Sequence, residues 1–148
     1  LRIMCQFVDD IYEVVRLIRQ RNDFDIVIER DYIQNKKASG YRSYHIVLEY
    51  PVQRIEGETK ILVEIQIRTL AMNFWASTEH QLRYKKDKVI TSEMHARLKK
   101  CADIMADADY QMQKTGGGNS FLGKISIRKQ YEDECIQIET CRRNLFLI

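Results

Sequence analysis

Two segments in the first half of the chain alternate between apolar and polar residues, which is typical of strands that bury one face and expose the other. In the first segment the two faces consist of Tyr44, Ile46, Leu48 and Tyr50 and of Ser43, His45, Val47 and Glu49. In the second they consist of Ile61, Val63, Ile65 and Ile67 and of Leu62, Glu64, Gln66 and Arg68. A turn around Gly57 separates the segments, so the pattern predicts a hairpin over residues 41–68.

The polar face of this hairpin has two interpretations. A solvated sheet face explains an alternating Glu, Gln and Arg, and it is the usual reason for such a pattern. Here, however, the polar face ends in a Gly-Tyr-Arg-Ser loop at residues 40–43 and runs into a predicted helix at its other end. This arrangement predicts a shallow site with a floor of polar side chains.

Before the hairpin, the pattern predicts a strand and then a helix. Residues 1–8 are mostly apolar and predict a buried strand. Asp9 and Asp10 supply N-cap chemistry for a helix that should end near Asn22. The apolar side of this helix recurs at helical spacing in Ile11, Val14, Val15 and Ile18.

A second strand and a loop lead into the hairpin. Residues 24–32 predict the strand, and residues 35–40 predict a polar loop that ends at Gly40. Pro51 is the only proline, and we expect it to close the first strand of the hairpin because proline cannot donate to a ladder.

Two helices are predicted after the hairpin. Thr69 is a plausible N-cap for a helix that runs to about Lys86, and its apolar start should lie against the sheet. Its two sides consist of Leu70, Phe74 and Ser77 and of Met72, Trp75, Ala76 and Glu79. Thr91 or Ser92 caps the second helix.

The second of these helices carries a heptad-like seam. Its apolar residues, spaced by threes and fours, are Met94, Leu98, Cys101, Met105, Ala108 and Met112. The seam fits docking on the domain and a contact between subunits equally well. The TGGGN run at residues 115–119 should end the helix, and no function is assigned to the tail at residues 118–148.

Length and composition indicate one globular domain. The chain has 148 residues, of which 45% are hydrophobic and 30% charged. It contains neither an apolar run of membrane-spanning length nor a signal-peptide pattern, so a cytoplasmic location and no membrane partner are expected. The four cysteines include no CxxC pair, which indicates neither a zinc site nor a disulfide framework.

The net charge of +3 does not predict a dedicated nucleic-acid binder, and no DNA partner is expected. The basic residues nevertheless gather in and beside the hairpin and at the end of the helix that follows it. They are Arg30, Lys36, Lys37, Arg42, Arg54, Lys60, Arg68, Arg83, Lys85, Lys86 and Lys88. This local excess suits an anionic ligand such as a nucleotide, although a solvated basic surface would produce the same pattern.

Three side chains are candidates for binding or chemistry. Tyr41 offers a face on which a base can stack, worth roughly 1–3 kcal/mol, but a tyrosine packed over the hairpin is the more common finding. Glu64 could hold a divalent metal with a phosphate or accept a proton, or it could simply pair with Arg68. His45 could bind a phosphate, although a lone histidine is more often structural. The neighbouring Glu79 and His80 lack the spacing of a helical zinc site.

Together these features resemble the synthetase domain of the RelA/SpoT family, and most closely its small alarmone synthetase branch. The resemblance is carried by RIMCQFVDDIY, ERDYIQNKKASGYRSYH and EIQIRTLAMNFWASTEHQLRYK and extends over residues 1–117. It implies an α+β, nucleotidyltransferase-like fold, in which a mixed sheet is flanked by helices and a long helix follows. It also implies Mg²⁺-dependent transfer of pyrophosphate from ATP to the 3′-hydroxyl of GTP or GDP.

The resemblance assigns roles to individual positions. Tyr41 matches the residue that stacks on guanine, and Glu64 matches the carboxylate that contributes to magnesium binding and activates the 3′-hydroxyl, with Gln66 and Arg68 as its supporting neighbours. The positions that line the acceptor phosphates are Lys36, Lys37, Arg42 and His45, and Ser43 is a further nucleotide-binding position. Asn73 and Ala76 match positions near the guanine edge. The small branch further implies a homotetramer and regulation by (p)ppGpp or single-stranded RNA.

The residues that bind ATP in this family, and its magnesium-binding aspartate, precede the residues that match 1–3. We therefore expect residues 1–117 to form the acceptor half of a synthetase and this chain alone to be inactive or nearly so. Two alternatives remain open, namely a guanine-nucleotide-binding regulatory module without transfer chemistry and an RNA-binding domain.

Overall fold

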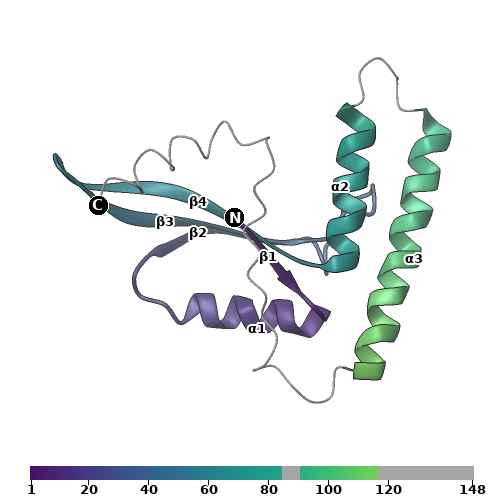
Figure 1. The fold of residues 1–148 in the computed structure, drawn as a ribbon, viewed down its shortest axis with the longest axis horizontal. Coiled ribbons are helices and arrows are strands. Elements are labelled where there is room, and N and C mark those ends of the chain that lie inside the picture. The colour runs from purple at the N-terminus through teal and green to yellow at the C-terminus, as the bar shows by residue number, and fades with distance from the viewer. Residues whose placement is uncertain (85–90, 117–148) are drawn as a thin grey trace.

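Four strands form one mixed sheet in the order β1-β4-β3-β2 (Figure 1). The computed structural model describes residues 1–84 and 91–116. Its elements are β1 (Arg2–Cys5), α1 (Val8–Arg19), β2 (Asp25–Asp31), β3 (Tyr44–Arg54), β4 (Gly57–Thr69), α2 (Leu70–Tyr84) and α3 (Ser92–Gly116). β1 runs parallel to β4, and the other neighbours are antiparallel. The predicted α+β fold, with a mixed sheet and a long last helix, is confirmed.

The β3–β4 hairpin has the two faces that its alternation predicts. Tyr44 lies opposite Ile67 and Ile46 opposite Ile65, and cross-strand pairs share a face. All four are buried, and they belong to the main core. The turn is formed beside Gly57, and its φ of 118° is one that glycine adopts at little cost.

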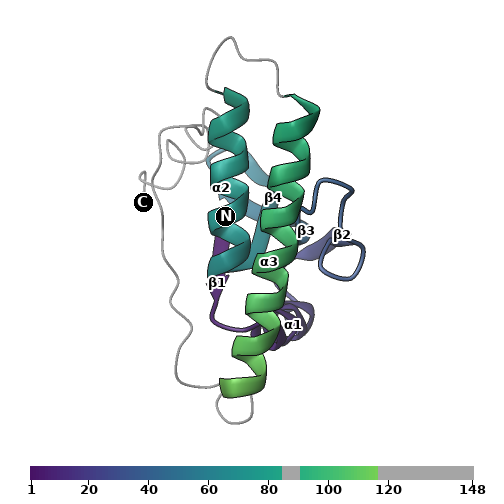
Figure 2. The same cartoon turned by 90° about the vertical axis from the view of Figure 1, so that its right-hand side faces the viewer.

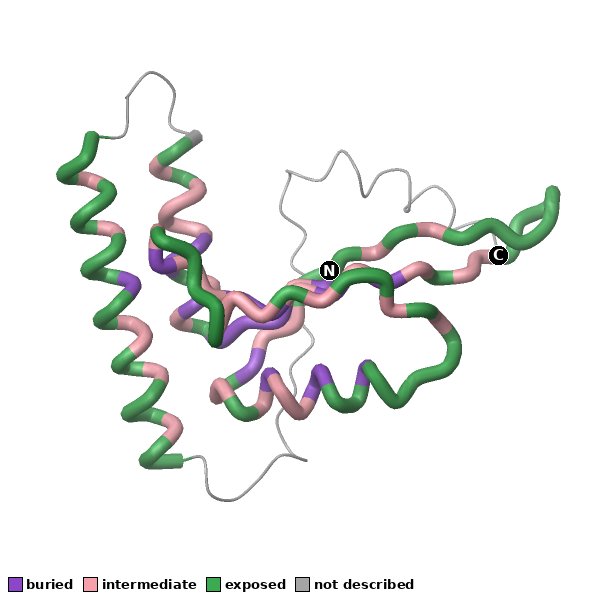
Figure 3. The backbone as a smooth tube through the Cα atoms, turned by 180° about the vertical axis from the view of Figure 1, so that it is seen from behind, coloured by how far each residue is buried: buried purple, intermediate pink, exposed green. Residues whose placement is uncertain are grey.

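α1 covers the apolar face of the sheet (Figures 1 and 3). Its buried residues are the predicted Ile11, Val14, Val15 and Ile18. The N-cap prediction was wrong, because Phe7 is the capping residue and Asp9 and Asp10 lie in the first turn. Asp10 reaches back instead, and its carboxylate accepts the Phe7 N–H at 3.0 Å.

Three predicted boundaries need correction. β1 spans Arg2–Cys5 and not residues 1–8, because β4 pairs with it only opposite those four residues. α1 ends at Arg19 and not near Asn22. β3 continues beyond Pro51 to Arg54. Proline is tolerated there because β2 pairs with β3 only as far as Glu49, so Pro51 has a neighbouring strand on one side alone.

α2 and α3 stand side by side in opposite directions at one end of the sheet (Figures 1 and 2). Thr69 caps α2 as predicted, since its Oγ1 accepts the Met72 N–H at 3.2 Å. Thr91 caps α3 by accepting the Met94 N–H at 3.3 Å. On the buried side of α2, Met72 at the start of the helix belongs to the main core against the sheet, as predicted, whereas Trp75 and Ala76 pack toward α3.

The predicted seam on α3 is half right. Leu98 and Met105 dock on the cluster of Trp75, Ala76 and Ala102. Cys101, Ala108 and Met112 are exposed, because the contact follows Ala102 and not the heptad. Their role in a subunit contact stays a prediction. α3 continues through Gly116, and the tail lies outside the described residues. Among those residues, no helix is both long and apolar enough to cross a membrane.

Candidate functional site

A connected set of hydrogen bonds runs across the polar face of the hairpin, from Arg68 to Glu64. The Arg68 Nη2 donates to the Tyr41 hydroxyl at 2.6 Å. That hydroxyl lies 2.8 Å from Nε2 of His45, whose Nδ1 lies 2.7 Å from Oε1 of Glu64. β3 and β4 position these groups, because His45 is paired with Gln66, and Val47, two residues further along β3 on the same face, is paired with Glu64.

Arg68 is the buried charge that anchors this set. Only 5% of the residue is exposed, and burial lowers the pKa of its guanidinium from a normal value far above neutrality. Its Nε donates to Ser43 Oγ at 3.2 Å and its Nη2 to Gln66 Oε1 at 2.6 Å. A guanidinium held by several acceptors has little freedom, so it fixes the hydroxyl of Tyr41 in place.

His45 and Glu64 differ sharply in exposure. The His45 side chain is 15% exposed, whereas that of Glu64 is 50% exposed. Burial lowers the pKa of His45, and the Glu64 carboxylate opposes this shift without overcoming it. Burial therefore favours the neutral form of the His45 imidazole. Glu64 directs one carboxylate oxygen to His45, and half of its side chain is exposed to solvent.

The ring of Tyr41 lies within an aromatic cluster. Tyr32 meets it edge to face at 6.0 Å between ring centroids, and Trp75 lies at 6.4 Å. The Lys37 ammonium is 4.6 Å from the Tyr32 centroid and 5.3 Å from that of Tyr41. Tyr41 is half-buried, so it is neither fully solvated nor wedged beneath its own hairpin.

Gly40 brings this cluster against α3. Its φ is 91°, and a Cβ at this position would lie 2.5 Å from the Cβ of Ala102. Both the backbone conformation and the close approach therefore require glycine. The turn is closed by the Gly40 N–H, which donates to the Lys37 carbonyl at 2.8 Å.

Two of the predicted phosphate-binding residues pair with α3. Arg42 Nη2 lies 2.5 Å from Oδ2 of Asp109, with the two side chains only 11% and 9% exposed. The same oxygen accepts a hydrogen bond from Thr69 Oγ1 at 3.1 Å. Lys36 pairs with Asp103 at 3.2 Å, but both of these side chains are exposed.

The other predicted residues surround the hydrogen-bonded set. Ser43 is fully buried beneath Arg68. Ala76 is buried in the cluster against which Tyr41 packs. Asn73 is half-buried on α2, and its Oδ1 is a buried atom without a hydrogen-bond partner in the described part of the chain.

Sequence reasoning missed Tyr32 and Asp109. Tyr32 immediately follows β2, and its proximity to Tyr41 could have been suspected from the loop that joins them. Asp109 carried no such signal, because its partner Arg42 is 67 positions away.

The fit of a magnesium ion depends on Glu64. Within residues 1–84 and 91–116 no group of three His, Cys, Asp or Glu side chains could hold a metal. Mg²⁺ is commonly bound through one or two carboxylates together with substrate phosphates, so a single half-exposed carboxylate among cations fits this mode.

Comparison with known proteins bears on this geometry. Residues 1–89 match the family described as "Region found in RelA / SpoT proteins". The chain is 51% identical over 117 residues to GTP pyrophosphokinase YjbM of Bacillus subtilis (strain 168). The matched segment covers 79% of this chain and 56% of that protein. The chain spans about half the length of the curated relatives it matches.

Solved structures match the described fold as well. The crystal structure of small alarmone synthetase 1 from Bacillus subtilis bound to its product pppGpp has a TM-score of 0.74 at 51% identity, covering 78% of this chain and 59% of that one. The same synthetase bound to AMPCPP has a TM-score of 0.64 at 44% identity, covering 78% and 57%.

Proposed function

Because this chain belongs to the RelA/SpoT family, we propose that it carries the acceptor-nucleotide site of a (p)ppGpp synthetase. The intact enzyme would transfer pyrophosphate from ATP to the 3′-hydroxyl of GTP or GDP. The observation that carries the proposal is the connected polar set from Arg68 to Glu64, which lies on the open face of the hairpin beside a cationic loop.

The guanosine nucleotide would bind across Tyr41. Its base would stack on the Tyr41 ring, with Asn73 and Ala76 at the guanine edge. The Asn73 Oδ1 is buried and unpartnered in the described part of the chain, so the side chain would turn before this oxygen accepts a hydrogen bond from the base. Lys37 already lies beside the ring and can turn its ammonium to the phosphates. Lys36 is held only by an exposed ion pair, which costs little to break.

Arg42 has a different status from these lysines. Its ion pair with Asp109 is nearly buried, so a phosphate could recruit Arg42 only by leaving a carboxylate unpaired in a poorly solvated place. We therefore expect Arg42 to act mainly by holding the loop in position.

The chemistry assigned to Glu64 is proton acceptance. Its free oxygen would take the proton of the 3′-hydroxyl as the hydroxyl oxygen attacks the β-phosphorus of ATP. The bond from that phosphorus to the oxygen bridging to the α-phosphorus breaks, and AMP leaves. Arg68 and Gln66 hold the adjoining polar face rigid, and such positioning supplies much of the rate enhancement in phosphoryl transfer.

Magnesium would be held by Glu64 together with nucleotide phosphates. When bound, the ion would neutralise part of the negative charge on the transferred phosphates. The chain's own residues contribute the carboxylate and the surrounding cations.

Transfer assays with ATP and GTP test this function. We expect the longest gene product that contains these residues to form pppGpp and AMP, and the 148-residue chain alone to form little or none. Glu64→Gln should lower the rate about 100- to 10,000-fold, the usual contribution of a general base. Glu58→Gln changes an exposed carboxylate of the same strand and should leave the rate unaltered.

Three outcomes would redirect the proposal. Nucleotide binding without product in the longest gene product would indicate a regulatory module. Salt-sensitive RNA binding that survives loss of Tyr41 would favour an RNA-binding domain. Equal activity in Glu64→Gln and Glu58→Gln would remove Glu64 from the chemistry.

The assembly expected of the small branch is a homotetramer. The exposed apolar side chains Leu70 and Phe74 on α2 and Ile104 and Met112 on α3 suit a contact between copies. Light scattering on the intact protein would measure its mass directly.

A further inference from the structure

We propose that His45 is a positioning residue for Glu64, and that it donates its Nδ1–H to one oxygen of the carboxylate and so directs the other toward the acceptor hydroxyl. This inference rests on the proposed function of Glu64. It gives His45 a role in the transfer step rather than in binding the acceptor phosphates.

Both ring nitrogens of His45 are already occupied. Nδ1 lies 2.7 Å from Glu64 Oε1, and Nε2 lies 2.8 Å from the Tyr41 hydroxyl. A phosphate could bind the imidazole only by displacing one of these partners. The ring also meets Tyr32 edge to face at 5.3 Å between centroids, and its side chain is 15% exposed. His45 is therefore fixed in orientation by contacts on several sides.

The direction of each hydrogen bond follows from the chemistry of the groups. An ionised carboxylate can only accept, so Nδ1 of His45 carries the proton. Arg68 can only donate, so its N–H occupies an acceptor site of the Tyr41 oxygen. The remaining Tyr41 O–H is then free to donate to Nε2. The donors thus run in one direction, from Arg68 through Tyr41 and His45 to Glu64, and they fix the imidazole in its Nδ1–H tautomer.

Glu64 needs such an orienting partner. Half of its side chain is exposed, and an exposed glutamate on a strand samples several rotamers. A hydrogen bond from a largely buried imidazole of fixed orientation selects one of them. The arrangement follows the general rule that a catalytic base is itself oriented by a third group.

The tautomer of His45 can be measured without any assay of activity. Two-dimensional ¹H–¹⁵N spectra of the imidazoles in the 148-residue chain should show His45 as the Nδ1–H tautomer, assigned by its absence from His45→Asn. Glu64→Ala should change these shifts and Glu58→Ala should not. An Nε2–H tautomer, or imidazole chemical shifts that stay unchanged in Glu64→Ala, would overturn the proposal.

Kinetics on the intact enzyme provide the second test. His45→Gln keeps an amide near Nε2 but loses the donor at Nδ1, and it should lower kcat roughly 10- to 100-fold, the effect of one hydrogen bond to a charged group. KM for the guanosine nucleotide should stay within about twofold, because no binding contact is lost. His45→Asn places its amide nitrogen near Nδ1 and should recover the greater part of kcat.

The opposite pattern would contradict the role. A raised KM with unchanged kcat in His45→Gln would make His45 a phosphate ligand, and equal losses in the Gln and Asn variants would reduce it to a structural residue. Absence of product from the wild-type enzyme would refute the proposed function instead, and the tautomer measurement would then decide whether His45 orients Glu64.

Discussion

The β3–β4 hairpin has an inner half (residues 44–49 and 62–69) and an outer half (residues 50–61). The two halves have the same alternating pattern but different surroundings. The inner half pairs with β2 through Glu49 and with β1 through Gln66 to Thr69, and α1 covers its apolar face. In the outer half, the two strands pair only with each other (Figure 3). Ile55 at the tip of the outer half is fully exposed.

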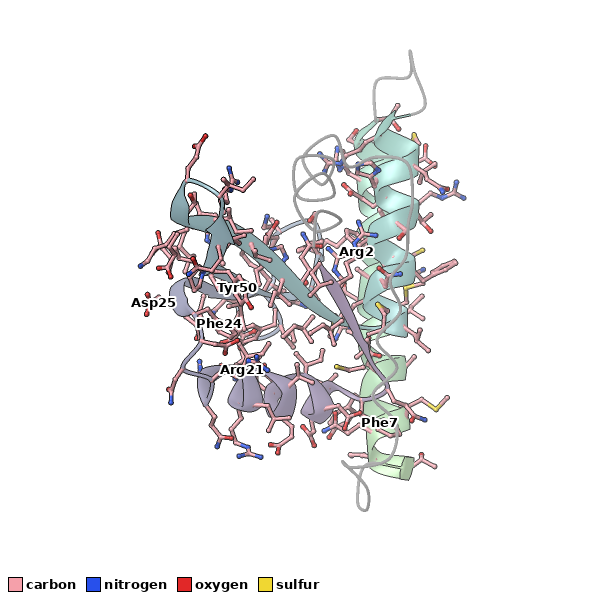
Figure 4. All side chains as sticks on the ribbon, turned by 60° about the vertical axis from the view of Figure 1, so that its left-hand side comes forward. Arg2, Phe7, Arg21, Phe24, Asp25 and Tyr50 are labelled. Atoms are coloured by element: carbon pink, nitrogen blue, oxygen red, sulfur yellow. The ribbon has the colours of Figure 1, made fainter. Side chains whose placement is uncertain are left out.

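This difference explains where the candidate site lies. His45, Gln66 and Arg68 alternate along the strands with the buried residues Tyr44, Ile46, Ile65 and Ile67. A well-packed apolar face fixes the backbone, and the polar face above it inherits that rigidity. In the outer half, Phe24, Tyr50 and Arg21 provide only a loose contact beside the end of α1 (Figure 4). Alternation alone therefore does not make a site.

The largest expected effect concerns the contact that holds the inner half to α3. Asp109→Ala leaves Arg42 as a nearly buried charge without its partner, so it should lower the free energy of unfolding by about 3–5 kcal/mol. Asp103→Ala breaks the exposed pair with Lys36 and should cost less than about 1 kcal/mol. Urea denaturation measures both. Equal effects would show that α3 is not fastened at Asp109.

The next effect separates the two halves directly. Ile67 is fully buried, and Ile67→Ala should cost about 2–5 kcal/mol of unfolding free energy because it leaves a cavity in the core. Ile55 lies fully exposed at the tip of the outer half, and Ile55→Ala should stay within about 0.5 kcal/mol. Thermal and urea unfolding of the two variants would check this. A costly Ile55→Ala would mean that the outer half is covered in solution.

A smaller effect compares the glycines at the two ends. Gly40→Ala should cost about 1–3 kcal/mol from a strained φ and from crowding against Ala102. Gly57→Ala meets no atom within 4 Å and should suffer the conformational cost alone. Adding Ala102→Gly to Gly40→Ala should therefore show favourable coupling in a double-mutant cycle of unfolding free energies. Strict additivity would contradict the close approach.

The sequence predicted the local features and missed those that depend on distant partners. The faces of the hairpin, the apolar side of α1 and the Thr69 cap follow from spacing and residue type, and all are confirmed. Pro51 was misjudged because its tolerance depends on where β2 ends. The α3 seam was misread because Gly40 and Ala102, far apart in sequence, decide which side of α3 packs.

The site showed the same division. Tyr41, His45, Glu64 and Arg68 could be named from the sequence, and the resemblance to the family gave them roles. Their hydrogen-bonded order could not be predicted, because Tyr41 and Arg68 lie 27 positions apart and their rotamers depend on the packed structure. The position of Arg42 against Asp109 required the docked α3.

We expect the polar face of the inner half to bind a guanosine nucleotide. Calorimetry with GDP and this chain, comparing Tyr41→Ala with Tyr110→Ala on the exposed side of α3, tests it most directly. We expect GDP to bind and Tyr41→Ala to weaken binding roughly 5- to 150-fold, the loss of one stacked base, while Tyr110→Ala binds as the wild type does. Unchanged affinity in Tyr41→Ala, or no binding to the folded wild-type chain, would contradict the claim.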